Sequence, residues 1–348
     1  MTKTECSAMR GLAIQGIVLH NYCHWLGFAV KENEYIFSID NCQGLWHALC
    51  NPTWNLPIHL ISFFGHYGVP IFLFLSGYGL TKKYVQSGKP LENTKDFILS
   101  HFAKLFKMMI VGFVAFILID AITPGRHHYD VWDVFGQLFM FNNFFSRPDV
   151  AICPGPYWFF GLMLQLYILY RLFVYQLNRE KLSVFILICC AVQMLCAPES
   201  DTLNYLRYNF IGGMLPFALG IMWAKYEHSY TRSVYIAALL LAVIVTFAFS
   251  FSYYLWLWVP MFICILAVAV IKLNPLWLNK VMAWVGSISA ALFVVHPITR
   301  KILIPISRSG DVYVGILLYI VCSLVVAWIF RELIQRIPFT YHPQHNKK

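Results

Sequence analysis

The first stretch of the sequence that could do chemistry is MRGLAIQGIVLHNYCHW, residues 9–25, where polar side chains interrupt an apolar run. Arg10 lies at its start, and His20 follows ten residues later, about 15 Å along a helix that rises about 1.5 Å per residue. Asn21 and His24 extend the polar stripe. A neutral imidazole can accept a proton near pH 7, so the stretch predicts a general base, with His20 as the first candidate. The alternative is a histidine that only hydrogen-bonds a neighbouring helix.

The second such stretch is GHYGVPIFLFLSGYGL, residues 65–80. His66 lies within it, and Ser76, Gly77 and Tyr78 lie near its end. Glycine allows a helix or a ligand to approach the backbone closely. The stretch therefore predicts either one wall of a ligand pocket or plain helix packing.

Three later features leave similar alternatives open. Lys104 and Lys107 are neighbours on a helix surface, so they either bind phosphates or anchor a helix end at the membrane surface. His296 follows a long apolar run, and it either lies at the membrane interface or has a functional role. Trp158 is typical of an interfacial aromatic belt, and Gln165 of a hydrogen bond between packed helices.

The composition indicates a membrane protein. Of the 348 residues, 59% are hydrophobic and 12% are charged, and the mean hydropathy is +0.62. Soluble domains contain about 25% charged residues, so this chain lacks the charges that a water-soluble surface needs. The net charge of +10 comes from basic residues spread between apolar runs, which argues against a nucleic-acid partner. The 10 Cys show no metal-ligand or redox spacing, so we expect no metal; whether Cys42 and Cys50 pair is open.

The elements that must position the polar residues are membrane-spanning helices of about 20 mostly apolar residues each. The sequence predicts an all-α, polytopic helical bundle of about ten such spans in a lipid bilayer, with one domain over residues 1–348. The predicted spans are 9–29, 57–80, 104–122, 156–178, 181–197, 206–225, 233–250, 253–273, 281–304 and 312–335.

The distribution of Lys and Arg predicts the orientation of these spans. With the N-terminus in the cytoplasm, the inside segments hold 19 of the 26 Lys and Arg residues, and the outside segments hold 7. This excess predicts that the N- and C-termini are both cytoplasmic. Arg300, Lys301 and Arg308 are an exception, because they fall in the last outer loop. Either these bases meet an anionic substrate, or the last two predicted spans are wrong.

At these residues the sequence resembles the acyltransferase-3 family of bacterial integral membrane acyltransferases. The similar segments occur in the family's order across nearly the whole chain. They are Arg10-Gly11 to His20, Gly68 to Tyr78, Lys104 with Lys107, Trp158 to Tyr167, and Gly286 to His296.

The resemblance implies an O-acetyltransferase-type enzyme of the bacterial inner membrane. It implies acyl-CoA, usually acetyl-CoA, as a co-substrate without a bound cofactor, and a hydroxyl of a cell-surface glycan or lipid-linked glycan as the acceptor. By this resemblance His20 is the base or proton carrier, and Arg10 orients the donor. Ser76 and Gly77 would shape the pocket, while the other candidates for binding donor or acceptor are Asn21, Tyr78, Lys104, Lys107, Trp158, Gln165 and His296.

Three positions depart from the family pattern. The family His falls eleven residues after the Arg, where this chain has Asn21, whereas His20 and His24 fall ten and fourteen residues after it. Which of these two histidines is catalytic therefore stays open. The basic pair is Lys where the family often has Arg, and Phe293 stands where Tyr is usual.

A different class of protein would share several of these features. A transporter that exports a glycan or a small acylated metabolite, without covalent chemistry, would also bury His and Arg. Transporters often contain inverted repeats, and no repeat stands out in this sequence, which favours the enzyme.

Overall fold

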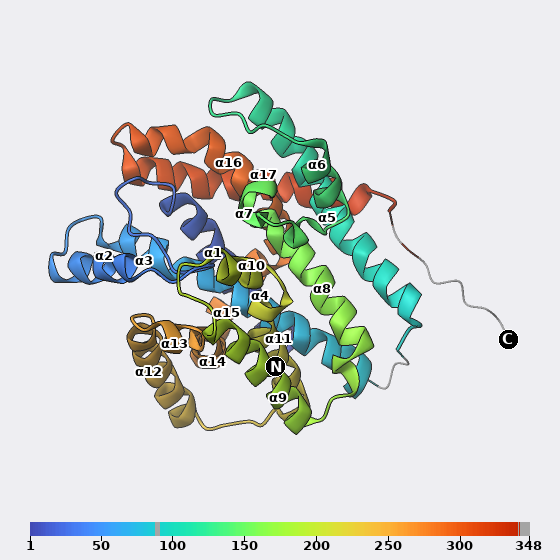
Figure 1. Ribbon diagram of the computed structural model, residues 1–348. Helices are drawn as coiled ribbons and strands as arrows, with labels where there is room; N and C mark the ends of the chain where they lie inside the picture. Colours follow the sequence, from blue (N-terminus) through green and yellow to red (C-terminus); the bar gives the residue numbers. More distant parts are fainter. Residues whose placement is uncertain (88–90, 340, 342–348) are drawn as a thin grey trace.

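The fold is described from a computed structural model of the protein, which covers residues 1–87, 91–339 and 341. All regular secondary structure in these residues is helical, so the predicted all-α class is confirmed. Figure 1 shows a bundle in which α12 lies at one edge and α5 at another.

The long helices match most of the predicted spans. They are α1 (Lys3–Cys23), α4 (Gly68–Thr81), α5 (Thr94–Ile122), α8 (Trp158–Leu172), α9 (Arg179–Met194), α11 (Phe210–Tyr226), α12 (Arg232–Phe249), α14 (Val259–Leu273), α15 (Leu276–Ser287), α16 (Ser289–Arg308) and α17 (Val312–Arg336).

Shorter elements join these helices. They are α2 (Ile39–Cys50), α3 (Leu56–Phe64), α6 (Val131–Leu138), α7 (Pro148–Ala151), α10 (Asp201–Tyr208) and α13 (Tyr253–Trp256), with single turns η1 (Gly65–Tyr67), η2 (Lys82–Gln86), η3 (Asn142–Phe144), η4 (Gly155–Tyr157) and η5 (Val174–Gln176). Cys42 and Cys50 both lie in α2 as free thiols, so they do not pair.

Five helical segments of the described chain are long and apolar enough to cross a bilayer. They are Leu56–Gln86, Thr94–Ile122, Arg232–Phe249, Ser289–Arg308 and Val312–Arg336. The apolar helices α11 and α14 are shorter. The protein is therefore an integral membrane protein with several spanning helices, and the total of ten spans stays a prediction.

Residues 281–304, predicted as one span, form two helices that follow one another. The helix α15 ends at Ser287 and α16 begins at Ser289. The Ser287 hydroxyl donates a hydrogen bond to the Trp284 carbonyl at 2.7 Å. Serine side chains that bond to nearby backbone compete in this way with helix continuation, and the preceding Gly286 has a low helix propensity.

Glycines bring the central helices into close contact. A Cβ atom on Gly77 of α4 would lie 2.1 Å from the Phe217 carbonyl oxygen of α11. A Cβ atom on Gly286 of α15 would lie 1.9 Å from the Ser7 carbonyl oxygen of α1. Small residues at such contacts are typical of membrane helices, which associate by close packing.

The contacts also give the direction of the helices. Ser7 of α1 lies beside Gly286, and the Tyr22 hydroxyl further along α1 donates to the Leu303 carbonyl at 3.1 Å. The helices α1, α15 and α16 therefore run the same way, and we call the end where α1 starts the N-terminal end of the bundle. The end of α17 lies beside the middle of α5, because Lys107 Nζ donates to the Gln335 carbonyl at 3.4 Å.

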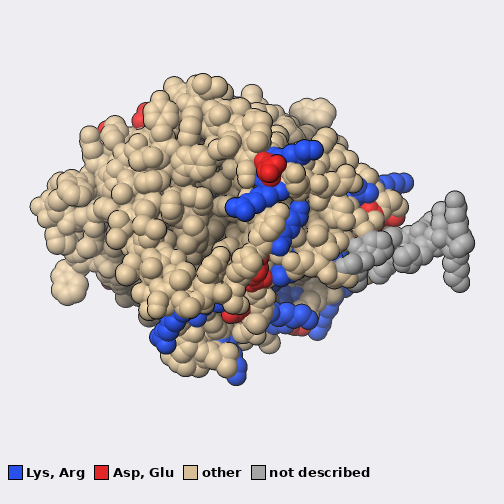
Figure 2. Space-filling model, turned by 90° about the horizontal axis from the view of Figure 1, so that it is seen from below, with Lys and Arg blue, Asp and Glu red and all other residues tan. Residues whose placement is uncertain are grey.

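Much of the surface is apolar. Figure 2 shows Lys and Arg gathered in one part of this face, with broad uncharged surface around them. The helices α12 and α17 expose the large apolar side chains Leu240, Leu241, Ile244, Leu317, Val321 and Trp328. In water such patches would be costly, and in a bilayer they contact lipid.

Candidate active site

The histidine predicted as the base is held firmly in the bundle. His20 is 4% exposed, and a Cβ atom on Gly65 would lie 2.7 Å from its Cβ, so only glycine lets η1 approach α1 here. His20 Nδ1 donates a hydrogen bond to the Ser62 carbonyl at 2.8 Å. Since a carbonyl only accepts, Nδ1 must carry the proton, and in the neutral ring Nε2 then has a free lone pair. The arrangement fixes the tautomer that a general base needs.

A second histidine forms a pair with an acid. His24 Nδ1 lies 2.5 Å from Oε2 of Glu32, which belongs to the loop after α1. Burial alone would raise the pKa of Glu32, but the hydrogen bond from His24 and the nearby His20 and His66 rings lower it to about 2. Glu32 is therefore ionised at neutral pH, and it can orient His24 as the carboxylate of a catalytic triad orients its histidine.

These groups line one cavity of about 280 Å³, which we call the central cavity. Its lining includes Ile17, His20, Asn21, His24, Glu32, Glu34, His66, Trp158, Phe159, Phe293 and Arg300. The rings of His20 and His66 are 5.5 Å apart between centroids. Both ring nitrogens of His66 are buried without a hydrogen-bond partner in the described chain, so this histidine has free polar atoms beside the candidate base.

The same residues bear on whether a metal ion could bind. One ligand atom each from His20, His24 and Glu32 lie within 4.8 Å of one another. Imidazole and carboxylate are suitable zinc ligands. However, the 2.5 Å contact between His24 and Glu32 leaves no room for an ion between those two atoms.

Glu34 is a further acid of this cavity that the sequence reasoning missed. Burial and the neighbouring Glu32 raise the pKa of Glu34 to about 8, so the side chain is mostly protonated at neutral pH. Both acids come from the segment KENEYIF, residues 31–37, eight to ten residues after His24. Two acids soon after a buried histidine stripe, in a chain with only 16 acidic residues, were the available signal.

A smaller cavity of about 180 Å³ lies toward the N-terminal end, and we call it the Arg10 cavity. Arg10, Ser76, Tyr167 and Ser289 contribute its polar side chains. It shares Ile17, Phe159 and Phe293 with the central cavity. The Phe159 and Phe293 rings are 5.2 Å apart between centroids, so an aromatic pair lies where the two cavities adjoin.

A larger cavity of about 730 Å³ lies beyond the central one, and we call it the vestibule. It shares Trp25, Asp149, Gly155 and Arg300 with the central cavity. Its other polar lining residues include Asp120, Arg126, His127, His128, Lys301 and Arg308. Asp120 lies near the end of α5, so the vestibule is at the opposite end of the bundle from Arg10. The three cavities follow one another along the bundle.

The structure thus brings together some of the predicted residues. Arg10 and Ser76 share the Arg10 cavity, whereas the central cavity holds His20, Asn21, His24 and Trp158. The remaining predicted residues line none of these three cavities: Gly77, Tyr78, Lys104, Lys107, Gln165 and His296.

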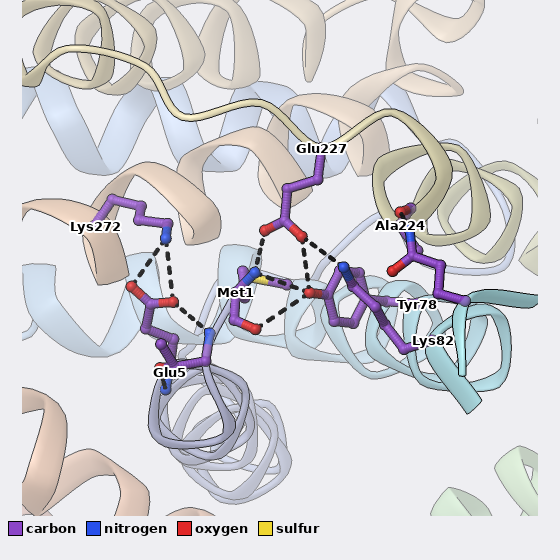
Figure 3. Close-up of polar contacts among 9 residues, drawn as sticks. Met1, Glu5, Tyr78, Lys82, Ala224, Glu227 and Lys272 are labelled. Atoms are coloured by element: carbon purple, nitrogen blue, oxygen red, sulfur yellow. Dashed lines mark hydrogen bonds and ion pairs between the residues drawn. The ribbon is translucent and has the colours of Figure 1, made fainter. Parts of the chain in front are cut away.

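Tyr78 belongs to a polar network at the N-terminal end, which Figure 3 shows. Its hydroxyl accepts a hydrogen bond from the Met1 ammonium at 2.8 Å and donates one to Glu227 at 3.0 Å. Lys82 lies 3.0 Å from Glu227, which also pairs with the Met1 ammonium. Burial would raise the pKa of Glu227, but these two cations lower it to about 2. The network ties α1 to α4 and to the end of α11.

Other predicted residues also have structural contacts. Gln165 Nε2 donates to Asn209 Oδ1 at 2.8 Å, and its Oε1 accepts from the Phe210 amide at 3.0 Å, so it joins α8 to α11. His296 is fully buried inside α16, next to the Phe293 ring. Lys104 is exposed on α5, where Leu105 and Met108 line the Arg10 cavity instead.

One comparison with known proteins gives the family of the chain. The model of the acyltransferase-3 family, which describes an acyltransferase domain, matches residues 6–332. The match includes every residue of the three cavities named above. Comparisons with curated proteins and with solved structures found no match. The chain belongs to the acyltransferase-3 family, and it is a membrane acyltransferase.

Proposed function

We propose that this protein transfers an acetyl group from acetyl-CoA to a hydroxyl of a cell-envelope glycan, free or lipid-linked. The observation that carries the proposal is the hydrogen bond from His20 Nδ1 to the Ser62 carbonyl. It leaves Nε2 as a proton acceptor in a cavity that adjoins a second cavity on either side. Donor and acceptor can then reach the base from opposite ends.

The donor enters at the N-terminal end. Arg10 is the cation of the Arg10 cavity, and a guanidinium suits the phosphates or the thioester carbonyl of acyl-CoA. The apolar lining, which includes Phe72, Leu105 and Met163, suits the uncharged arm that carries the acyl group. The thioester passes Phe159 and Phe293 to reach the central cavity.

The transfer itself needs one base. His20 Nε2 takes the proton of the acceptor hydroxyl as its oxygen attacks the thioester carbon. The carbon–sulfur bond breaks, and the departing CoA thiolate takes the proton from the imidazolium. The product is an O-acyl ester and free CoA, and His20 returns to its starting form.

His24 is the alternative base, since Glu32 holds its Nδ1 in the same way that Ser62 holds that of His20. We assign the base to His20 because it is the more buried of the two. His24, with a side chain 30% exposed, then keeps Glu32 in place.

We place the N-terminal end in the cytoplasm and the protein in the bacterial inner membrane. The excess of Lys and Arg in the segments at that end supports this orientation. Acyl-CoA is then the cytoplasmic co-substrate, with no bound cofactor, and the vestibule faces the envelope.

A direct experiment is to supply acetyl-CoA with a labelled acetyl group to the purified protein, with methyl β-D-glucoside or methyl β-D-glucuronide as acceptor. We expect labelled O-acetyl sugar and an equal amount of free CoA. Neither sugar becoming acetylated, together with no release of CoA, would contradict the proposal.

The line of three cavities also favours a second candidate, an exporter. An exporter would move the sugar across the bilayer unchanged, and it would need no acetyl-CoA. Proteoliposomes loaded with either sugar separate the two functions. Export of unmodified sugar without acetyl-CoA supports the exporter, whereas acetylation without net export supports the enzyme.

A further inference from the structure

The vestibule contains a buried cation whose charge no acid balances. Arg300 is 9% exposed and lines both the vestibule and the central cavity. Its guanidinium lies 4.6 Å from the Trp25 ring centre, and its Nη1 lies 3.4 Å from two oxygens of Asn21. Within the described chain no carboxylate forms an ion pair with it.

The acids of the vestibule already have partners. Asp120 forms an ion pair with Lys301 and accepts a hydrogen bond from the His127 amide at 2.9 Å. Asp149 lies 3.1 Å from Arg147. These two are the acids of the vestibule lining, so no carboxylate of this lining is left to form an ion pair with Arg300.

Besides Lys301, which pairs with Asp120, two further cations lie in the same lining. Arg308 donates a hydrogen bond to the Trp25 carbonyl at 2.8 Å, and Arg126 is exposed. The vestibule therefore has a net positive charge, and its most buried cation lies at the boundary with the central cavity.

A guanidinium removed from water without a counter-ion is costly, and a bound anion offsets that cost. Arg binds carboxylate and phosphate groups through two parallel hydrogen bonds, and aromatic stacking leaves its edge free for them. The Trp25 ring provides such a stacking surface. A volume of about 730 Å³ is within the range of pockets that hold drug-sized ligands, about 300–1,000 Å³.

We propose that the vestibule binds an anionic glycan, and that Arg300 receives its carboxylate or phosphate group. An acceptor held there presents a nearby hydroxyl to the central cavity, where His20 and His24 lie. This selection of anionic acceptors rests on the proposed acyl transfer, whereas the binding of the anion does not.

The test measures binding without acetyl-CoA. The full chain is placed in nanodiscs of phosphatidylcholine, so that no anionic lipid competes. Thermal shifts are recorded with methyl β-D-glucuronide, glucose 1-phosphate and the neutral methyl β-D-glucoside. We expect both anions, and not the neutral sugar, to stabilise the wild type.

The variants locate the site. We expect Arg300→Gln to weaken binding of both anions at least tenfold, and Arg300→Lys to retain part of it. Arg232→Gln is the matched control, because Arg232 is exposed on α12 away from the vestibule, and it should bind like the wild type. If one of the two Arg300 variants does not fold, the other decides alone. Weaker binding of both anions than in the wild type then supports the inference.

Three results would overturn the inference. They are equal binding of the neutral sugar, wild-type binding by Arg300→Gln, and displacement of the anions by coenzyme A, which would assign the site to the donor. Anion binding in a protein that transfers no acetyl group would leave this inference standing and remove the proposed function. The opposite outcome is acetylation of the two methyl glycosides with equal KM, in the wild type and in Arg300→Gln alike. That outcome would leave the proposed function standing and remove this inference.

Discussion

At the scale of single residues, the chemistry depends on which ring nitrogens of His20 and His24 are held by hydrogen bonds within the protein. Ser62 fixes Nδ1 of His20, and Glu32 fixes Nδ1 of His24. Each Nε2 is then the atom available to a substrate. The negative charge of Glu32 lies close enough to stabilise the imidazolium that forms on either ring.

Glu32→Gln tests this electrostatic role. The amide keeps the size of the side chain and removes the charge, so the imidazolium formed in the reaction loses its stabilisation. We expect kcat to fall about tenfold or more, which corresponds to about 1.4 kcal/mol, with little change in KM for acetyl-CoA. Asp311→Asn, on the loop before α17, is a control. A wild-type kcat in Glu32→Gln would contradict the role.

Glu34 predicts a dependence of stability on pH. An unfolded Glu ionises near pH 4.3, whereas Glu34 in the folded protein has its pKa raised to about 8. Between these values the unfolded chain loses a proton that the native chain keeps, so native stability falls as pH rises. Glu34→Gln has no proton to lose at this position, so its stability does not fall in this way as pH rises. Its Tm relative to the wild type should increase by about 2 °C or more from pH 5 to pH 8 and then level off. A constant difference would show that Glu34 titrates normally.

Part of the site could be predicted at this scale. Arg10, His20, Asn21 and His24 are charged or polar within an apolar helix, which is rare enough to be informative. Glu32 and Glu34 were missed, although they follow His24 closely, because a polar loop usually contains acids. Only the folding back of this loop places them beside the histidines.

At the scale of helices, glycine contacts position the site. Gly77 was predicted to shape the ligand pocket, but it packs α4 against the backbone of α11. The sequence could not separate the two alternatives, because both need a residue without a side chain. The break after α15, next to Gly286, could not be predicted either. Two helices there follow one another within a single long apolar run of the sequence.

Gly77→Ala tests the packing role. The added methyl group overlaps the Phe217 carbonyl, so we expect a loss of about 1–3 kcal/mol in the free energy of unfolding. Gly79→Ala on the same helix is a matched control, since a Cβ atom there meets nothing within 4 Å. Thermal unfolding followed by tryptophan fluorescence measures both. Equal Tm values for the two variants would contradict the packing role.

At the scale of the whole molecule, the cavities form a sequence from one end of the bundle to the other. The apolar surface and the helical class could be predicted from composition alone. The cavities could not, because they arise where helices distant in the chain fail to fill the space between them. Arg300 shows the difference: it was predicted in an outer loop, and it lies inside α16.

The proposed orientation predicts which segments are accessible from outside the cell. The background is a variant in which the exposed Cys50 and the partly exposed Cys6, Cys153, Cys196 and Cys322 are replaced by serine. A cysteine replacing Ser309 then lies at the vestibule end, and one replacing Ser229 lies at the N-terminal end. A membrane-impermeant maleimide applied to spheroplasts should label Ser309→Cys and leave Ser229→Cys unlabelled until the cells are lysed. The reverse pattern would invert the topology.

The central claim is that His20 is the base of an acyl transfer, and the rates of three variants test it most directly. Release of CoA from acetyl-CoA is measured at saturating donor for His20→Ala, His24→Ala and His228→Ala, the last an exposed histidine outside the cavities. The account predicts a loss of about 10²–10⁴-fold in His20→Ala, a smaller loss in His24→Ala and the wild-type rate in His228→Ala. A wild-type rate in His20→Ala, with the large loss in His24→Ala instead, would contradict it.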